Sequence, residues 1–257
     1  MQKPKMAIQL YTLRDHIKTA EDFDSTLSRL QNMGVRDVQI SAIGDIPAET
    51  QRDILQKHGM QVCVTHKSFD WMLEAPQDVI EHHRIIGCSA IGIGAAPNDA
   101  RYNTRTVRAF IEKAQRVGKL FRESGMQFHY HNHAFEFHRL DDHMGCMMDL
   151  LLNETDPELF WFIPDLAWIR YGGQDPAEFL YKMRGRVKVV HFKDYVFDKD
   201  GYRKFVSLGR GVVDLKACYQ AVCELGIPFI AYEQDCEWTD GDPFKSTEES
   251  WAFLQSL

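Results

Sequence analysis

The sequence has no long apolar run, no cysteine pair of the C-x-x-C type and no excess of basic residues, and each absence excludes a class of protein. Nowhere do about 18 apolar residues follow one another, so no membrane-spanning helix is expected. The chain has 30 Lys and Arg against 37 Asp and Glu, which gives a net charge of −7. Because it also lacks a basic stripe, we do not expect nucleic acid as a partner.

The chain also lacks the features of secreted and of multidomain proteins. It has six cysteines in 257 residues, a length at which disulfide scaffolds are uncommon, and its start has no signal-peptide pattern. We therefore expect free thiols in a reducing compartment and a cytoplasmic location. No linker or low-complexity tract divides the chain, so residues 1–257 are predicted to form a single domain.

What the sequence does contain is one pattern repeated six times: an amphipathic stretch, a glycine and a short apolar run. Glycine just after a helix adopts a left-handed conformation without steric cost, so each glycine marks a predicted helix end. These glycines are Gly34, Gly59, Gly87, Gly125, Gly185 and Gly226. The apolar positions from Val107 to Phe121, Leu120 included, follow one helical stripe. His82 and His83 lie on another predicted helix, and we expect both on its solvated face.

Eight short runs rich in β-branched and aromatic residues are predicted to be buried strands. They begin near residues 6, 35, 60, 89, 126, 159, 187 and 227, a spacing that fits one strand and one helix per unit. Eight such units in about 250 residues are typical of a single (β/α)8 TIM barrel, an α/β fold. The alternative, an open doubly wound sheet, would carry a glycine-rich phosphate loop after its first strand, where this chain has YTLRDHIK.

Polar residues gather where the last four predicted strands end, which is where TIM barrels have their active sites. Glu136, Asp165, His191 and Glu233 follow strands five to eight, one on each. Three converging carboxylates would repel one another, and a divalent cation removes that cost. Carboxylates with one imidazole favour Mn²⁺, with Mg²⁺, Co²⁺ and Zn²⁺ as alternatives. We therefore predict one divalent metal ion as the cofactor.

The segment HYHNHAFEF, residues 129–137, holds the densest group of candidate residues. His129, His131 and His133 share one face of the predicted strand because side chains alternate along a strand. Each is either a metal ligand or a hydrogen-bond partner of the ligands.

Five motifs, in order along the chain, resemble one family. The chain reads QLYTLRD at strand one, YHNHAFEF at strand five, PDLAW at strand six, VVHFKD at strand seven and YEQD at strand eight. Together they resemble the xylose isomerase-like superfamily of sugar phosphate isomerases and epimerases, over essentially the whole chain. The resemblance implies metal ligands at Asp165, His191 and Glu233.

The fourth ligand of that superfamily is a glutamate from strand five, and here the resemblance is less direct. His131 stands at the usual glutamate position. The nearest carboxylate, Glu136, resembles the displaced glutamate of inosose dehydratases. Glu136 is therefore predicted as the fourth ligand, with His131 as the alternative.

The resemblance implies a metal-dependent isomerase or epimerase with a small-molecule keto-sugar or polyol as substrate. A carboxylate would remove the proton next to a metal-polarised carbonyl. The expected catalytic residues are Glu136, Glu233, His133 and Lys193. The expected substrate-binding residues are His66, His131, Tyr11, Trp168 and Arg210. Arg210 lies in a long connection, residues 195–211, that we expect to close over the substrate.

Two other functions stay open. A lysine or histidine acid near a leaving hydroxyl fits a metal-dependent dehydratase of an inosose or keto-sugar equally well. A barrel that binds a sugar without converting it is the third alternative. The sequence leaves undecided which sugar is bound, whether it is phosphorylated and whether the chain forms a homo-oligomer.

Overall fold

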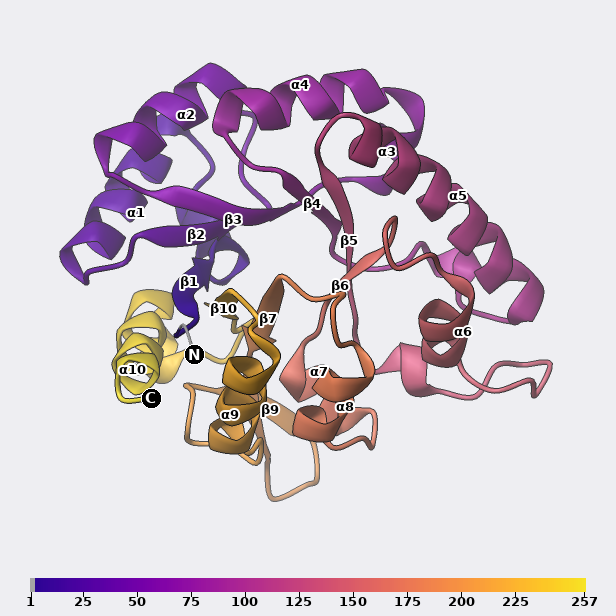
Figure 1. Ribbon diagram of the computed structural model, residues 1–257. Helices are drawn as coiled ribbons and strands as arrows, with labels where there is room; N and C mark the ends of the chain where they lie inside the picture. Colours follow the sequence, from indigo (N-terminus) through magenta and orange to yellow (C-terminus); the bar gives the residue numbers. More distant parts are fainter. Residues whose placement is uncertain (1–2) are drawn as a thin grey trace.

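Eight parallel strands form the centre of the molecule, and helices surround them (Figure 1). The structure, a computed structural model, describes residues 3–257. The strands lie in the order β6-β5-β4-β3-β2-β1-β10-β7. They are β1 (Lys5–Gln9), β2 (Asp37–Ile40), β3 (Gln61–His66), β4 (Ala90–Ile93), β5 (Gln127–His131), β6 (Trp161–Ile163), β7 (Val189–Phe192) and β10 (Phe229–Tyr232). The predicted TIM barrel is confirmed, and each of the eight predicted runs overlaps one of these strands.

The barrel closes between β6 and β7 with less backbone pairing than elsewhere. The other neighbouring strands form ladders of consecutive pairs, whereas β6 and β7 meet at two isolated bridges. One bridge joins Phe162 to Val187 and the other joins Asp165 to His191. The backbone N–H of His191 donates to the carbonyl of Pro164 at 2.8 Å. This seam between β6 and β7 therefore includes two residues that the sequence predicts as metal ligands.

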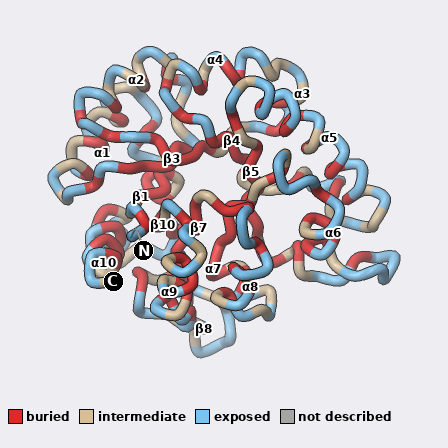
Figure 2. The backbone as a smooth tube through the Cα atoms, viewed as in Figure 1, coloured by how far each residue is buried: buried red, intermediate tan, exposed pale blue. Residues whose placement is uncertain are grey.

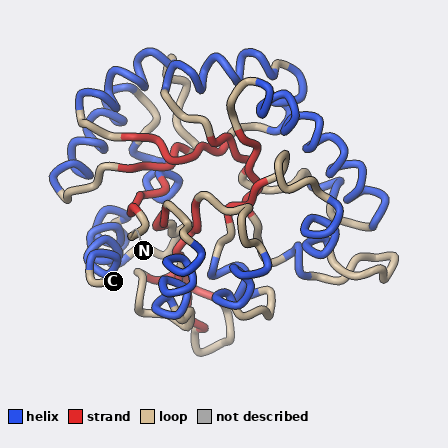
Figure 3. The backbone as a smooth tube through the Cα atoms, in the orientation of Figure 1, coloured by secondary structure: helices blue, strands red, loops and turns tan. Residues whose placement is uncertain are grey.

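Helices cover the outside of the strands all round the barrel (Figure 3). The α-helices are α1 (Ala20–Asn32), α2 (Ala48–Lys57), α3 (Phe69–Glu74), α4 (Pro76–Ile86), α5 (Thr104–Glu123), α6 (Met147–Glu154), α7 (Leu166–Tyr171), α8 (Pro176–Lys182), α9 (Leu215–Leu225) and α10 (Pro243–Gln255). Short 3-10 helices are η1 (Leu10–His16), η2 (Asn98–Ala100), η3 (Phe135–Phe137) and η4 (Thr239–Gly241). The six predicted helix-ending glycines all have φ between 61° and 88°, which confirms them.

The strands separate two apolar layers, and Figure 2 shows the buried strands at the centre of the molecule. The side chains inside the barrel are mostly small, for example Ala7, Ala90 and Ala231. Larger side chains fill the space between strands and helices, where the stripe of α5 packs. Leu120 departs from that stripe, because 37% of it is exposed. The prediction of a core position was wrong there.

His83 on α4 is buried, contrary to the predicted solvated face. It lies on the same face of the helix as Val79 and Ile86, which are three or four residues away and also buried. Its Nδ1 donates to the Val79 carbonyl at 2.6 Å, and its Nε2 accepts from the Thr65 hydroxyl at 2.8 Å. Because both ring nitrogens have hydrogen-bond partners on the protein, the neutral ring can be buried at little cost in free energy.

The long connection after β7 is a β-hairpin. Its strands β8 (Asp194–Phe197) and β9 (Arg203–Val206) pair antiparallel. The Asp198 side chain accepts from the backbone N–H groups of Asp200 and Tyr202, which closes the turn. After β9, the segment 207–213 returns to the barrel, and the Asp194 carboxylate accepts four backbone N–H groups. These come from Tyr195, Gly209, Gly211 and Val213.

All six cysteines are free, as predicted. Within residues 3–257, no helix has both the length and the apolar character that crossing a bilayer requires.

Candidate metal centre at the carboxyl ends of the strands

Four side chains from four strand ends converge at the mouth of the barrel. His131 ends β5, Asp165 follows β6, His191 lies in β7 and Glu233 follows β10. One ligand atom from each lies within 4.8 Å of the others, and all four residues are buried. The structure thus brings together three of the predicted metal ligands, with His131 in the fourth place.

Both histidines of the cluster are oriented by the nitrogen that faces away from it. His131 Nδ1 lies 3.0 Å from the Gly94 carbonyl, and His191 Nε2 lies 2.7 Å from the amide oxygen of Gln39. Because each of these partners is an acceptor, we assign the proton of each neutral ring to its outer nitrogen. The inner nitrogens then present lone pairs to the cluster, as in metal sites whose histidines are held by outer partners.

The inner nitrogens face carboxylate oxygens. His191 Nδ1 lies 3.0 Å from Glu233 Oε2, and His131 Nε2 lies 3.4 Å from Asp165 Oδ2. Each contact joins two acceptors when the rings are neutral, so it is favourable only with a cation between them. Two oxygen and two nitrogen donors that converge in this way fit a divalent metal ion of the borderline class.

Lys193, from the same strand end as His191, supplies one positive charge to the cluster. Its ammonium lies 3.0 Å from Glu233 Oε2, 3.2 Å from Asp165 Oδ2 and 3.0 Å from Asp235 Oδ1. Burial opposes the charge of Lys193, but the three carboxylates outweigh it and raise its pKa above the ordinary value. Lys193 therefore stays protonated in this arrangement.

The carboxylates of the cluster are ionised. Burial alone would raise the pKa of Glu233, but Lys193 and His191 outweigh it and hold that pKa well below its usual value. The pKa of Asp165 is lowered in the same way, against burial, by Lys193 and His131. Burial also opposes protonation of His131, yet its two carboxylate neighbours raise its pKa. The whole cluster thus attracts positive charge.

Glu136 lies outside this cluster. The chain leaves β5 at His131 and turns through η3, so Glu136 points to the outer face of the strand, where Tyr130 packs between barrel and helices. Its carboxylate accepts from the Tyr130 hydroxyl at 2.6 Å and from the His133 backbone N–H at 2.9 Å. Burial raises the pKa of Glu136 to about 7. The prediction that Glu136 joins the other three ligands does not match this placement.

Three other predicted residues border the cluster. His66 contacts the Gln39 amide nitrogen at 2.9 Å, and its ring lies 5.2 Å from the His131 ring. The ring of His133 lies 4.9 Å from that of His131 and 5.3 Å from that of Trp168. Burial, together with His131, lowers the pKa of His133 to about 3, so the ring is neutral.

Two other predicted substrate-binding residues have their recorded contacts outside the four clustered side chains. Tyr11 in η1 packs against the Arg14 guanidinium, 4.5 Å from its ring centre. Arg210 forms an ion pair with Glu249 of α10 at 3.1 Å, and its side chain is 59% exposed. Arg210 is thus paired with Glu249 in this arrangement, and closure of residues 195–211 over the substrate stays a prediction.

Sequence reasoning overlooked Arg203, which lies on β9 beside Trp168. Its guanidinium carbon lies 4.5 Å from the centre of the Trp168 ring and 3.9 Å from that of Phe205. The signal was present, because Asp200-Gly201 between aromatic residues is typical of a hairpin. A hairpin places Arg203 and Phe205 on one face of a strand.

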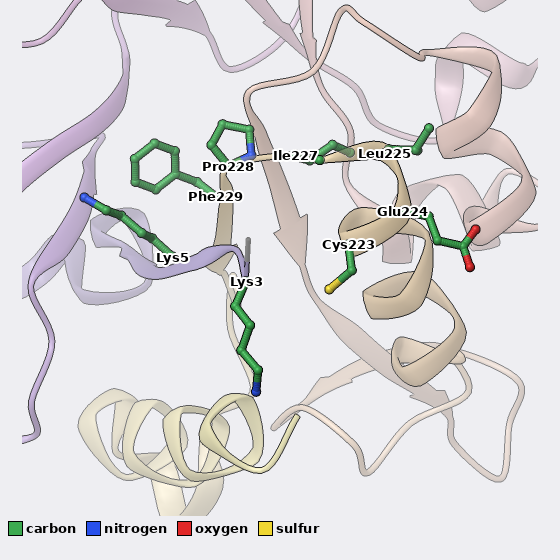
Figure 4. A pocket seen from close by; sticks show the side chains of 9 residues that line it. Lys3, Lys5, Cys223, Glu224, Leu225, Ile227, Pro228 and Phe229 are labelled. Atoms are coloured by element: carbon green, nitrogen blue, oxygen red, sulfur yellow. The ribbon is translucent and has the colours of Figure 1, made fainter. Parts of the chain in front are cut away.

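A separate hollow of about 410 Å³ lies at the opposite end of the barrel, where β1 and β10 begin (Figure 4). Lys3, Lys5 and Phe229 line it. None of the four clustered side chains borders this hollow, so it is distinct from the candidate metal centre.

The fold and the four converging side chains define a TIM barrel with a candidate metal centre at the carboxyl ends of its strands. The model of the family described as xylose isomerase-like TIM barrel matches residues 27–257. The chain belongs to this family.

Curated relatives and solved structures are similar to parts or all of the chain. An inosose dehydratase of Clostridium perfringens is 33% identical over 140 residues, 48% of this chain and 46% of the relative. One of Lacticaseibacillus casei is 25% identical over 157 residues, 55% of this chain and 51% of the relative. The matches thus span about half the length of these relatives. A sugar phosphate isomerase/epimerase of Parabacteroides distasonis has the same fold, with a TM-score of 0.83 at 22% identity over 100% of this chain and 97% of the other.

Proposed function

We propose that this chain is a metal-dependent enzyme that removes a proton next to the carbonyl of a keto-sugar or inosose and then eliminates a β-hydroxyl as water. One observation carries this proposal. Of the carboxylates around Lys193, Glu233 is the one that contacts both the Lys193 ammonium and His191 Nδ1, in a buried site.

The ligands of the metal ion would be His131 Nε2, Asp165 Oδ2, His191 Nδ1 and Glu233 Oε2. When bound, a divalent cation polarises the carbonyl of the substrate and so acidifies the neighbouring C–H bond. Mn²⁺ stays the proposed ion, with Mg²⁺, Co²⁺ and Zn²⁺ as the alternatives; a second imidazole in place of a carboxylate favours Co²⁺ and Zn²⁺ more than the predicted ligand set did. Gln39 and the Gly94 carbonyl would keep both imidazoles in the required tautomer.

Glu233 is the base in this mechanism. Its Oε2 contacts Lys193, whereas its Oε1 accepts no hydrogen bond from residues 3–257 and is available for a proton. Asp165 is less suited, because both of its oxygens are engaged. Its Oδ1 accepts from the Trp168 backbone N–H at 2.9 Å, and its Oδ2 faces Lys193. Asp165 therefore acts as a ligand and Glu233 as ligand and base.

Lys193 stabilises negative charge that develops on substrate oxygen. Its pKa is raised by three carboxylates, so it remains an ammonium at neutral pH. A fixed cation at hydrogen-bond distance from the reacting group lowers the free energy of an enolate. The proton that Glu233 has removed then passes to the β-hydroxyl, so that the group leaves as water and Glu233 is ionised again. His133, which is neutral, contributes a hydrogen bond rather than a proton.

Because Glu233 is the one base assigned in this cluster, the arrangement favours elimination over epimerisation. Epimerisation needs a proton donor on the face opposite the base, and Glu136, an expected catalytic residue, is the second glutamate that could have filled that role. Because the Glu136 carboxylate lies in the outer layer with Tyr130, the second base is missing from the cluster. The similarity to curated inosose dehydratases supports the same choice.

Isomerisation, which the sequence favoured first, is the second candidate. It needs only one base, because Glu233 can return the same proton to the neighbouring carbon. The free Oε1 of Glu233 favours this reaction as much as it favours proton removal.

Metal analysis of the purified protein, followed by NMR and mass spectrometry in D₂O, tests these proposals. The panel contains 2-keto-myo-inositol and a set of ketoses, each with the Mn²⁺-loaded and the chelated protein. We expect metal-dependent loss of one water from a panel member. A product of unchanged composition that has gained solvent deuterium would instead establish isomerisation. Sugar binding without exchange or metal would leave only a non-catalytic barrel.

A further inference from the structure

Three polar side chains next to the metal centre have a buried polar atom without a hydrogen-bond partner. They are Nδ1 of His133, Nε1 of Trp168 and Nη1 of Arg203. The three side chains are neighbours, because the Trp168 ring lies 5.3 Å from the His133 ring and 4.5 Å from the Arg203 guanidinium carbon. Buried polar groups are normally paired, so these three atoms together indicate a missing ligand.

Arg203 is the charged member of this group. Aromatic rings lie around its guanidinium, but its N–H donors have no hydrogen-bond partner among the residues that the structure describes. Its guanidinium lies 3.9 Å from the centre of the Phe205 ring and 5.4 Å from that of Tyr171, in addition to its contact with Trp168. Within residues 3–257 it donates no hydrogen bond, and no carboxylate lies within 4 Å of it. A guanidinium held by aromatic rings presents a rigid fork of N–H donors that matches the oxygens of a carboxylate or phosphate.

The same aromatic rings connect Arg203 to the reacting end of the site. The Lys193 ammonium lies 5.0 Å from the centre of Phe205 and 5.5 Å from that of Trp168. Lys193 is already neutralised by three carboxylates, whereas Arg203 has no anionic partner. A polyhydroxy substrate whose carbonyl lies at Glu233 and Lys193 would therefore extend along Trp168 towards an uncompensated positive charge.

We propose that the substrate carries an anionic group, a carboxylate or a phosphate, at the end remote from its reacting carbonyl, and that Arg203 binds this group. Nε1 of Trp168 donates a further hydrogen bond to the bound substrate. The inference rests on the proposed function for the orientation of the substrate. It narrows the substrate class from keto-sugars in general to acidic or phosphorylated ones.

Binding of three probes with one carbon skeleton tests the proposal. D-fructose is neutral, D-fructuronate carries a carboxylate at carbon six, and D-fructose 6-phosphate carries a phosphate there. Calorimetric titration of the chelated and of the Mn²⁺-loaded protein should show one anionic probe binding about tenfold or more tightly than fructose. The tighter of the two anions identifies the group. Equal affinity for all three probes would overturn the proposal.

Two variants distinguish a direct contact between Arg203 and the anionic group from non-specific electrostatic attraction. Arg203→Gln should lower the affinity for the anionic probe about tenfold or more, while the affinity for fructose stays within about twofold of the wild-type value. Arg170→Gln, which removes an exposed positive charge from the same helix as Trp168, should change neither affinity. An equal loss for fructose and the anions in Arg203→Gln would show that Arg203 only packs the pocket.

Because these titrations need no turnover, their outcome is distinguishable from that of the proposed reaction. Anion-selective binding without dehydration or isomerisation would retain this inference and reject the proposed function. Dehydration of a neutral substrate, with no selectivity for anions, would do the reverse.

Discussion

A histidine binds a metal through a nitrogen that carries no proton, and the outer partners of His131 and His191 provide this condition. The Gly94 carbonyl and the Gln39 amide oxygen each accept the proton of the outer nitrogen. Gln39 lies in β2, one residue before the end of that strand. Its function as the orienting partner of His191 depends on a contact across the barrel that spacing cannot predict.

At the same scale, we expect Glu233→Gln to remove the chemistry and keep the fold. Glutamine retains the shape and one oxygen donor but accepts no proton, so exchange of the substrate α-proton with D₂O should fall about a hundredfold or more. Mn²⁺ binding should weaken, and the circular dichroism spectrum should not change. Exchange at the wild-type rate would assign the base to another residue.

A paired comparison decides the fourth ligand. His131→Gln should weaken Mn²⁺ binding by more than about tenfold, because it removes an inner nitrogen of the cluster. Glu136→Gln should leave metal affinity nearly unchanged, because its carboxylate faces Tyr130. Equilibrium dialysis with Mn²⁺ measures both. A larger loss of Mn²⁺ affinity in Glu136→Gln than in His131→Gln would identify Glu136 as the fourth ligand, as predicted from the sequence.

His83 should make the protein less stable in mild acid. Burial lowers its pKa to about 3, against about 6.5 in an unfolded chain. Below pH 6.5 the unfolded chain binds a proton that the folded chain does not, so the free energy of unfolding decreases as the pH falls from 6.5 towards 3. At pH 5 the contribution of His83 is about 2 kcal/mol.

Urea unfolding of wild type and His83→Gln at pH 7 and pH 5 measures this contribution. The variant should lose less stability between the two pH values than the wild type does. Equal losses would mean that His83 is protonated in the folded protein.

At the scale of elements, the sequence predicts the direction of a side chain only within a strand, where successive side chains point to opposite faces. His129 and His131 follow the alternation of β5, and the position of His131 could be read from it. Glu136 could not, because the chain has left the strand and entered η3, where the two-residue period no longer applies. The hairpin β8–β9 was similarly expected as a loop, since its short strands pair only with each other.

The segment that follows the hairpin depends on close contact between Gly211 and Asp194. A Cβ at Gly211 would overlap the Asp194 carboxylate and the Tyr195 carbonyl, and Asp194 holds the backbone of residues 209–213. We expect Gly211→Ala to destabilise the protein by about 1–3 kcal/mol and to lower kcat/KM, because it displaces the hairpin that carries Arg203. Thermal unfolding and steady-state kinetics measure both effects.

Val212→Ala is the matched control for this prediction. Val212 is 46% exposed, so its truncation should change stability by less than about 0.5 kcal/mol. A Gly211→Ala protein that behaves like this control would show that the segment has another position open to it.

For the whole molecule, the eight-unit architecture could be predicted because each unit repeats the same local signals. That count places the first strand beside the last, as β1 and β10 pair here, whereas it does not indicate where the backbone pairing is weakest. Backbone pairing between β6 and β7 depends on how the ring of strands meets itself, and no local pattern encodes this. That residues 1–257 form a single domain stays a prediction, for which one cooperative unfolding transition is the expected result.

The weakly paired seam between β6 and β7 has a consequence for the whole barrel. Asp165 and His191 stand on its two sides and form one of its two bridges, so an ion bound to both would act as a cross-link that closes the ring. We expect chelation to speed hydrogen exchange at the seam amides of Phe162 and His191 more than at Ile230 in β10. Uniform acceleration at all three amides would contradict this.

If the ion closes the ring, its affinity and the resistance of the barrel to local opening are linked, and the linkage is reciprocal. A substitution that loosens β6 from β7 should then weaken metal binding even at a distance from the ligands. Conversely, binding of the ion would make local opening of the barrel between β6 and β7 rarer.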